Sequence, residues 1–390
     1  MKTTYPPTFS RRAVSLIFAI NGFLYTNWAA RIPRLQEMYG LSEGQISMIL
    51  LAHGIGALLI MPLTGKLIAR TGSRVLTMVM LLLFCSLTMF IPSFPSIWGI
   101  GTVLFLVGAS AGSLDIAMNA QASLIEQDYG RPIMSSFHAI FSAGMMLGAS
   151  SAGLFTQCGV SVQWHLVIVV TLAISLALFA IRYLVYDQPE TQSTADQTAT
   201  TSIWQRPRVL VLGIIAFCCM LGEGSMTDWT ALYLEKVSMG SPDWSAFGVT
   251  AFAAAMMIGR FLGDEARQRL GDSLLMKTGA ILAATGLVVA LVFPSILPGI
   301  LGFFLVGLGL STIVPIAYSV AGNLPGLAPG VGISMVTSIG YAGFLVGPAM
   351  IGLLAEWQGL RFGMTFVLLL FVVMLLLNFS RYLRTESVAE

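Results

Sequence analysis

Long apolar runs, separated by short polar segments, extend along almost the whole chain. Each run approaches the ~20 residues that an α-helix needs to cross a bilayer. The pattern predicts twelve membrane-spanning helices, at residues 13–32, 44–64, 74–92, 97–120, 134–156, 164–185, 208–234, 245–263, 274–292, 297–320, 331–354 and 362–382. The first run follows Arg11 and Arg12, but its length and the eleven later runs favour an uncleaved span over a signal peptide.

One longer polar stretch, DQPETQSTADQTATTSIWQRPR, lies near the midpoint of the chain. It is rich in Thr, Gln and acidic residues, a composition typical of a flexible linker. We therefore expect an N-terminal six-helix bundle over residues 1–186, a cytoplasmic linker over 187–207 and a C-terminal six-helix bundle over 208–390.

Short motifs of the first half recur in the second half at a nearly constant offset. FLVG at 105–108 returns at 304–307, and AGxxxGxxxxG at 143–153 returns at 342–352, both 199 residues later. TNW at 26–28 matches TDW at 227–229 at an offset of 201. Matches in corresponding helices indicate a duplicated bundle, an architecture typical of transporters in which one half rocks against the other.

Composition agrees with a membrane protein and excludes several classes. Of the 390 residues, 56% are hydrophobic and only 10% are charged, against about 25% in soluble domains. Twelve spans leave no room for a large soluble domain. A net charge of +2 without a basic block argues against nucleic-acid binding. The four cysteines lie in apolar runs without metal-ligand spacing, so we interpret them as packing residues.

Basic residues are distributed unevenly between alternate loops. All but four of the 20 Lys and Arg residues fall on one side if loops are assigned alternately from the N-terminus, the exceptions being Arg31, Arg34, Lys236 and Arg361. The positive-inside rule then places both termini in the cytoplasm, in a multi-pass protein of the inner (plasma) membrane.

Ionisable side chains inside the spans are the first candidates for function, because a charge in hydrocarbon is costly. Asp115 lies in the fourth span with Asn119 one turn further on, and Glu223 and Asp228 lie in the seventh. We predict proton coupling by Asp115 and Glu223, and solute binding by Asn119 and Asp228. A structural hydrogen bond is the alternative for Asp115, and a bond to Arg31 or Asn27 is the alternative for Asp228.

Further polar and aromatic residues are predicted to line a solute path. Asn21, Tyr25 and Trp28 form a helical stripe in the first span next to Asn27, and Tyr341 lies in the eleventh span. His138 begins the fifth span and is a candidate for solute binding, with hydrogen-bonded packing as its alternative. His53 is a weaker candidate of the same kind, and His165, at the start of a span, is expected at the membrane interface.

Two loops with similar glycine frameworks are candidate gates. GKLIARTGSR at 65–74 follows the second span, and GRFLGD at 259–264 follows the eighth, with Gly271 shortly after. Glycines permit a tight turn, and charges at the helix ends can pair and hold the inward side closed. We expect gating by Arg70, Arg74, Arg260 and Asp264.

The 65–74 loop resembles the signature loop of the major facilitator superfamily, G-x-L-A-D-R-x-G-R-R. Ala69 stands where the family has its acid, and Ser73 where it has a basic residue, whereas Asp264 in the second copy keeps an acid. GSLDIAMN at 112–119 is similar to the fourth-helix motif of fucose-permease-like transporters, whose acid couples protons. With FHAIFS at 137–142 and GYAGFLVGP at 340–348, the chain looks like the YbjJ-type inner-membrane proteins.

The sequence thus predicts an all-α integral membrane protein of the major facilitator fold. We expect a secondary transporter of a small polar organic solute such as a sugar, coupled to protons, working as a monomer by alternating access. It lacks the sequence signatures of a nucleotide site or a catalytic set, so we expect no cofactor and no enzyme activity. The alternatives are proton-antiport efflux of amphipathic compounds and a transport-silent membrane sensor of the same fold.

Overall fold

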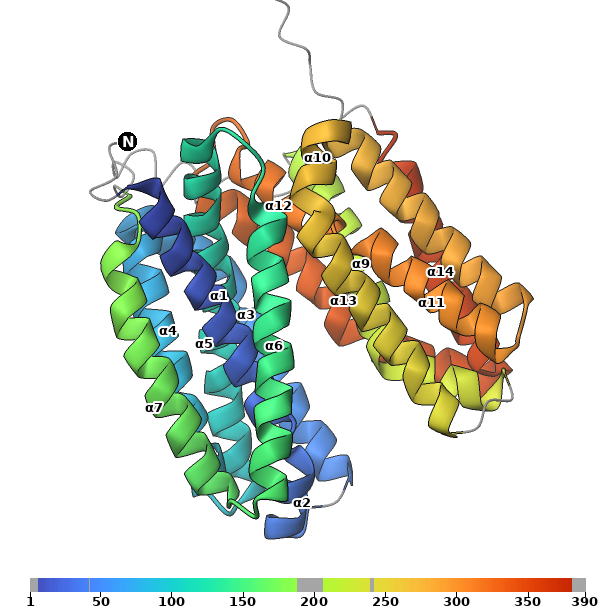
Figure 1. Cartoon of the computed structure of the whole chain (residues 1–390), viewed down its shortest axis with the longest axis horizontal. Helices are drawn as coiled ribbons and strands as arrows, with labels where there is room; N and C mark the ends of the chain where they lie inside the picture. The colour runs from blue at the N-terminus through green and yellow to red at the C-terminus, as the bar shows by residue number, and fades with distance from the viewer. Residues whose placement is uncertain (1–5, 42, 188–205, 239–241, 381–390) are drawn as a thin grey trace, which may run out of the picture. The chain divides into compact units, whose positions relative to one another are not determined.

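The computed structural model describes residues 6–41, 43–187, 206–238 and 242–380. These residues are almost entirely helical and contain no strand. The helices of the first half are α1 (Pro7–Ala29), α2 (Ile32–Tyr39), α3 (Glu43–Thr71), α4 (Ser73–Met89), α5 (Ile97–Tyr129), α6 (Met134–Gln157) and α7 (Val162–Ala180). Those of the second half are α9 (Pro207–Lys236), α10 (Pro242–Val292), α11 (Ile296–Leu310), α12 (Ile313–Gly322), α13 (Pro329–Gln358) and α14 (Leu360–Leu377), as Figure 1 shows.

The predicted spans correspond closely to these helices. Ten helices of the described residues are long and apolar enough to cross a membrane. The predicted first span corresponds to α1, which is not among the ten, and the predicted eighth and ninth spans both lie in α10. The short α2, after the first span, is an element that the apolar pattern did not predict.

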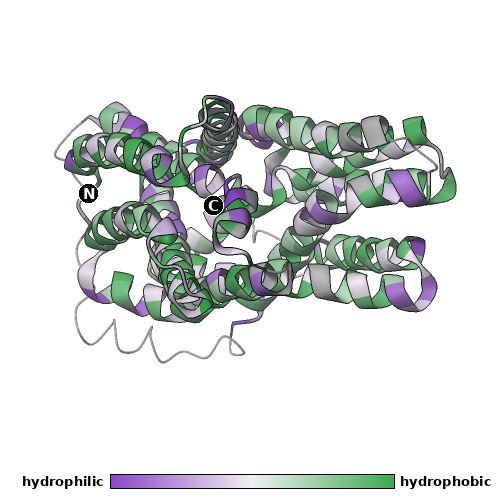
Figure 2. Ribbon diagram, turned by 90° about the horizontal axis from the view of Figure 1, so that it is seen from below, coloured by the Kyte–Doolittle hydropathy of each residue, from purple (hydrophilic) through white to green (hydrophobic). Residues whose placement is uncertain are grey.

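The surface of the helices suits hydrocarbon. Large apolar side chains are exposed along them, among them Leu59 (65%), Leu262 (61%) and Leu369 (59%). Figure 2 shows hydrophobic residues over most of the ribbon, with hydrophilic ones gathered mainly near helix ends. Because every backbone group inside a helix bonds within the helix, such elements can cross a bilayer without unsatisfied polar groups. The protein is therefore an all-α integral membrane protein.

The chain forms two compact units. Unit 1 comprises Met1–Arg131, Phe137–Thr201 and Gly322–Ser334, and unit 2 comprises Pro132–Ser136, Ser202–Ala321 and Met335–Glu390. Each unit thus includes a short segment from the other half of the sequence. The bundle boundaries predicted at 186 and 208 stay a prediction, and most of the predicted linker, at 188–205, lies outside the described residues.

Glycine contacts repeat within the two units at the offset of the sequence repeat. A Cβ at Gly108 of α5 would lie 2.0 Å from the carbonyl oxygen of His53, and one at Gly307 of α11 would lie 2.4 Å from that of Phe252. The two helices therefore approach backbone to backbone in each unit, as small residues allow in membrane bundles. Both members of the second contact stand 199 residues after those of the first.

The glycine turns repeat as well. Gly72, directly before α4, has φ +83°, and Gly271, which breaks α10 into two helices, has φ +74°. A residue with a Cβ adopts this left-handed backbone only at a cost, so glycine ends one helix and starts the next at both places. Gly72 and Gly271 thus form the predicted turns, whereas Gly65, Gly259 and Gly263 lie inside α3 and α10, where the sequence predicted loops.

Candidate functional site

Asp115 belongs to a chain of hydrogen bonds inside unit 1. The Nδ2 of Asn119 donates to Asp115 Oδ1 at 3.2 Å, and His138 Nε2 lies 3.1 Å from Asn119 Oδ1. With this amide orientation, Asn119 accepts from the imidazole and donates to the carboxylate. Asn119 is fully buried and His138 is 9% exposed, whereas Asp115 is half-buried. The carboxylate is thus the member of the chain that reaches open space.

The fold brings these three residues together from two helices. Asp115 and Asn119 lie one turn apart on α5, which begins at an N-cap by Ser96, whose side chain accepts from Gly99 N, and ends at Gly130 with φ +62°. His138 lies in the second turn of α6, where its ring meets Phe18 of α1 edge-on at 5.4 Å. The i, i+4 spacing was visible in the sequence; the contact with His138 was not.

The predicted aromatic stripe of α1 meets a histidine of α3. The ring of Trp28 lies 5.3 Å from that of His53, and Tyr25 lies 5.7 Å from Trp28. Tyr25 is 38% exposed and Trp28 only 2%. One turn before Tyr25 on α1, Asn21 contacts the sulfur of Met118 at 3.8 Å and is 6% exposed. Tyr25 is therefore the member of the stripe with the most open side chain.

Asn27 is fully buried and takes part in a hydrogen-bond network. Its Oδ1 accepts from Ser151 Oγ at 3.0 Å and faces His165 Nε2 at 2.8 Å, and its Nδ2 donates to Phe23 O. His165, in the first turn of α7, is 0% exposed and stacks on Phe155. Its burial is tertiary, because α7 turns this face toward α1, where Asn27 satisfies Nε2, and its place at the membrane interface stays a prediction.

Arg31 binds groups of unit 1 as well. Its guanidinium donates to Thr156 Oγ1 and to the carbonyl oxygen of Val160, and the residue is 2% exposed. The side chains of Arg31 and Asn27, offered above as structural partners for Asp228, thus have other hydrogen-bond partners. Asp228 itself is exposed, near the far end of α9.

Glu223 forms an ion pair with Arg260 inside unit 2. Nη2 of Arg260 on α10 lies 3.1 Å from Oε1 and 3.4 Å from Oε2 of Glu223 on α9. The side chains are 10% and 24% exposed. Arg260, predicted as a gating residue, thus lies against the candidate coupling acid, and its gating role stays a prediction. A buried guanidinium requires a counter-charge, which Glu223 supplies.

The other predicted solute-binding residue of the second half lies on α13. Tyr341 is half-buried, and its ring meets Phe344 edge-on at 5.9 Å. Phe344 in turn packs at Gly224, where a Cβ would lie 2.9 Å from its ring. Phe344 thus connects Tyr341 with the helix turn that carries Glu223.

Asp264 binds a helix N-terminus. Its carboxylate accepts from the backbone N–H groups of Ser135 and Ser136, each at 2.8 Å, and from the Ser136 hydroxyl. These serines open α6, and residues 132–136 belong to unit 2 together with Asp264. An anion at this position satisfies free N–H groups and complements the helix dipole. Asp264 is 8% exposed.

In the first half, the acid that binds the turn after α3 is Asp187, which does not stand at the acidic position of the signature. Ala69, at the signature position, is buried, and Asp187 accepts instead from Ser73 N at 2.5 Å and from Arg74 N at 3.1 Å at the start of α4. The guanidinium of Arg74 lies 4.1 Å above the ring of Tyr186, and Arg70 is exposed. Asp187 is 114 residues from Ser73, so no local signal identified it.

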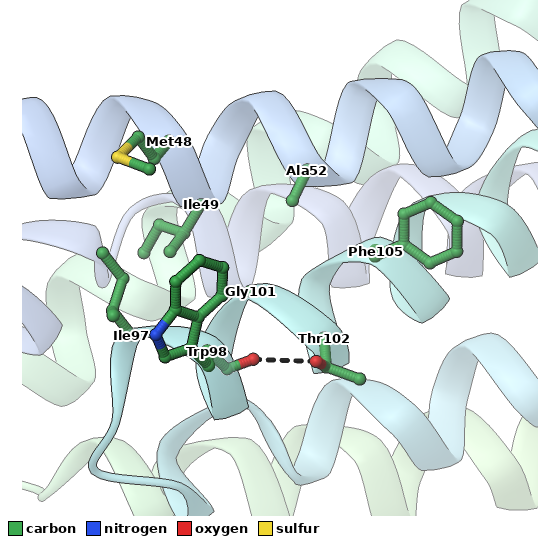
Figure 3. Close-up of a pocket in the computed structure, with 8 residues that line it drawn as sticks. All are labelled: Met48, Ile49, Ala52, Ile97, Trp98, Gly101, Thr102 and Phe105. Atoms are coloured by element: carbon green, nitrogen blue, oxygen red, sulfur yellow. Dashed lines mark hydrogen bonds between the residues drawn. The ribbon is translucent and has the colours of Figure 1, made fainter.

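A separate cavity of about 260 Å³ lies between α3 and α5 (Figure 3). Its walls are Met48, Ile49, Ala52, Ile97, Trp98, Gly101, Thr102 and Phe105. The hydroxyl of Thr102 is bonded to the Trp98 carbonyl at 2.8 Å, so the lining is essentially apolar. None of the predicted site residues lines it.

The spans form bundles with repeated glycine contacts and with polar groups inside the apolar helices. These features are typical of membrane transporters. A family model of the Major Facilitator Superfamily matches residues 14–329. An uncharacterized MFS-type transporter of Yersinia pestis is 35% identical over 92% of either chain. The chain therefore belongs to the Major Facilitator Superfamily, and it is a transporter by family.

Two further comparisons are more distant. A multi-drug resistance efflux pump PmrA homolog of Lactococcus lactis is 23% identical, over 92% of either chain. The crystal structure of the MFS transporter FucP in the outward conformation superposes with a TM-score of 0.80 at 16% identity, covering 94% of this chain and 97% of that one. At this identity the structural likeness shows the fold alone, and it agrees with the predicted fold class.

Proposed function

We propose that the protein carries a small polar organic solute across the plasma membrane by alternating access, as a monomer with both termini cytoplasmic, and couples this movement to protons. The observation that carries the proposal is the chain from His138 through Asn119 to Asp115. A half-buried carboxylate bonded to a buried Asn–His pair can take up a proton and change the bonds that its partners make.

The residues divide into roles. Asp115 and Glu223 exchange protons, and the more open side chains of Tyr25, Tyr341 and Asp228 contact the solute, with Asn119 and His138 behind Asp115. Asp264 acts as a gate: its hydrogen bonds with Ser135 and Ser136 hold the first turn of α6, and they would break if that turn moved. Arg74 and Arg70 are proposed as gating residues of the corresponding turn in the first half, where Asp187 accepts from the backbone at the start of α4.

The test replaces Asp115 by Asn, which keeps the size of the side chain and removes the titratable group. In proteoliposomes with a pH-sensitive dye inside, solutes that stabilise the purified protein should drive proton entry through the wild type. We expect Asp115→Asn to reduce this proton flux at least ten-fold. Asp128→Asn, an exposed carboxylate on the same helix, is the matched control and should retain it. Undiminished flux in Asp115→Asn would contradict the role of Asp115.

Proton-antiport efflux of amphipathic compounds is the second candidate. The sequence relation to the Lactococcus lactis efflux pump homolog favours it. The two functions differ in the direction of coupling: a symporter moves solute and protons the same way, whereas an antiporter moves them oppositely. Everted membrane vesicles with an imposed inside-acid gradient separate them, because only an antiporter accumulates a solute in those vesicles.

A further inference from the structure

Two ring nitrogens without a partner lie on neighbouring side chains inside unit 1. They are Nε1 of Trp28 on α1 and Nε2 of His53 on α3, and neither has a hydrogen-bond partner among the described residues. The two rings lie 5.3 Å apart, centre to centre, and Trp28 is only 2% exposed. Buried polar atoms nearly always have a partner, because a bond left unmade away from water costs free energy. Packing alone does not account for two such atoms on adjacent rings.

Tyr25 forms the open edge of the same aromatic cluster, which comprises Tyr25, Trp28 and His53. Its ring lies 5.7 Å from that of Trp28 and 6.0 Å from that of His53. Tyr25 is 38% exposed, whereas both nitrogens are shielded from solvent. A ligand therefore reaches the nitrogens when the Tyr25 ring turns aside, a change of side-chain rotamer that leaves the helices in place.

The cluster lies near the level of the candidate coupling acid in the bundle. Asn21 of α1 contacts Met118 of α5 at 3.8 Å. The two helices are the first and fourth spans of the chain, so they run in opposite directions. Tyr25 on α1 and Asp115 on α5 each lie about one turn from this contact, on the same side of it. A solute beside the Tyr25 ring is thus level with Asp115.

The chemistry of the two nitrogens favours a hydroxyl group. The indole Nε1–H of Trp28 only donates, whereas Nε2 of a neutral imidazole donates or accepts according to its tautomer. A hydroxyl accepts from Trp28 and either donates to His53 or accepts from it, so it fits both tautomers. An ammonium group only donates and cannot pair with Trp28. A carboxylate buried against two uncharged rings, Trp28 and Tyr25, would pay the full cost of desolvating its charge.

We propose that Trp28 and His53 form a subsite that binds a hydroxyl group of a neutral polyhydroxylated solute. The solute packs a C–H face against the ring of Tyr25, as aromatic side chains allow, and its remaining hydroxyls extend toward the level of Asp115. This inference rests on the proposed transport of a small polar solute, and it narrows the substrate class to neutral sugars and polyols.

The test removes one hydroxyl of a solute at a time. The probes are D-glucose, D-galactose, D-ribose and D-sorbitol at low millimolar concentration, with sodium gluconate and choline chloride as charged comparisons. The readout is the Tm of the full-length protein in detergent. We expect at least one neutral probe to raise the Tm, and its analogue that lacks the bound hydroxyl to bind about ten-fold more weakly.

Two variants remove the nitrogens and keep aromatic rings. Trp28→Phe and His53→Phe should each weaken binding of the parent solute about ten-fold, and each should bind the deoxy analogue as tightly as the parent. His53→Phe keeps the test valid if Trp28→Phe misfolds. Trp164→Phe makes the same change at an exposed indole of α7 and is the control, which should discriminate between the two solutes as the wild type does.

The indole N–H of Trp28 gives a direct readout that a structural role would not move. In protein labelled with ¹⁵N-tryptophan, the signal lost in Trp28→Phe identifies this N–H. The parent solute should shift the signal, and the deoxy analogue should leave it in place. A signal that no stabilising solute shifts belongs to an N–H that packs on a neighbouring ring, and it overturns the subsite.

The outcomes separate this inference from the proposed function. The subsite is overturned if no neutral probe raises the Tm, if the charged probes alone do so, or if both Phe variants discriminate as the wild type does. Proton flux driven by a solute in such a case upholds the proposed function without the subsite. Discrimination that requires Trp28 and His53 but moves no protons in proteoliposomes supports the subsite and overturns the coupling proposal.

Discussion

Polar side chains inside the bundles are of two kinds. Asn27 is fully buried and its amide is satisfied by groups of its own unit, whereas Asp115 and Glu223 have satisfied partners but remain partly open. A side chain of the first kind stabilises the fold, because removing it leaves buried partners without bonds. One of the second kind can also exchange a proton or meet a solute.

Asn27→Ala tests this distinction. The change leaves the buried His165 Nε2 without its partner, while the Ser151 hydroxyl keeps its bond to Gly148 O, and we expect a loss of about 1–3 kcal/mol of stability. The measurement is the Tm in detergent, together with the Tm increase that a stabilising solute gives. Asn378→Ala is the control, since Asn378 is buried and its side chain donates to Met374 O in the last turn of the preceding helix, α14. A normal Tm with lost solute response would instead make Asn27 a solute contact.

Helix pairs in both units are held at close range by glycine. The contact of α6 with α1 at Gly144 is repeated by that of α13 with α9 at Gly343. The residues that these glycines face, Ala19 and Phe217, are 198 positions apart, which differs from the offset of 201 between the TNW and TDW motifs. The TNW and TDW motifs gave one of the three matches that predicted the repeat. When the two helices are aligned by their glycine contacts, these motifs are displaced from each other by about one helical turn. The glycine matches align the two halves more accurately than the TNW and TDW motifs do, because a glycine without a Cβ fixes where the two helix backbones touch.

Gly144→Ala and Gly153→Ala form a matched pair on α6. The Cβ at Gly144 would lie 2.3 Å from Ala19 O, so the helices must separate, at a cost of about 1–3 kcal/mol. A Cβ at Gly153 meets nothing within 4 Å, and replacing a helical glycine there should be neutral or stabilising by about 0.5–1 kcal/mol. Thermal unfolding in detergent compares the two, and equal Tm values would refute close packing at Gly144.

Replacing Asp264, whose carboxylate binds the start of α6, tests the stabilisation of a helix end. Asp264→Asn replaces an acceptor-only group by an amide whose NH₂ opposes the backbone N–H groups of Ser135 and Ser136. We expect a loss of up to about 2 kcal/mol and an altered transport rate. Glu265→Gln changes an exposed neighbouring carboxylate and should leave both unchanged. Normal transport in Asp264→Asn would remove Asp264 from the gate.

The whole molecule is organised by the bilayer. Apolar helix faces point outward from the bundles, and the basic residues are concentrated in alternate loops. The predicted orientation, with both termini cytoplasmic, depends on that charge bias, since basic residues near helix ends are retained on the cytoplasmic side.

Reporter fusions test the orientation. Alkaline phosphatase joined after Gly159, between α6 and α7, should be active, whereas phosphatase joined after Gly130, between α5 and α6, should be inactive. Both glycines end helices with left-handed φ values, of +68° and +62°, and make no close contact, so neither fusion disturbs packing. Green fluorescent protein at the C-terminus should fluoresce. The reverse activities at Gly159 and Gly130 would invert the topology.

The sequence by itself determined the membrane class, the course of the spans and the repeat. Hydrocarbon forces each crossing into a helix of defined length, so the apolar runs carry this information locally. The scarcity of intramembrane charges also identifies Asp115 and Glu223 as candidates from the sequence alone. The short α2 was not predicted because eight residues give too little apolar pattern.

Only the tertiary structure decided which polar groups meet. Arg260 lies against Glu223, Asp187 against Ser73, and His165 against Asn27, across separations of 37, 114 and 138 residues. A hydrogen bond needs a partner within about 3 Å, and helix packing rather than chain order brings such partners together. The same packing places Arg260, a predicted gating residue, against the candidate coupling acid Glu223, and it buries the imidazole of His165.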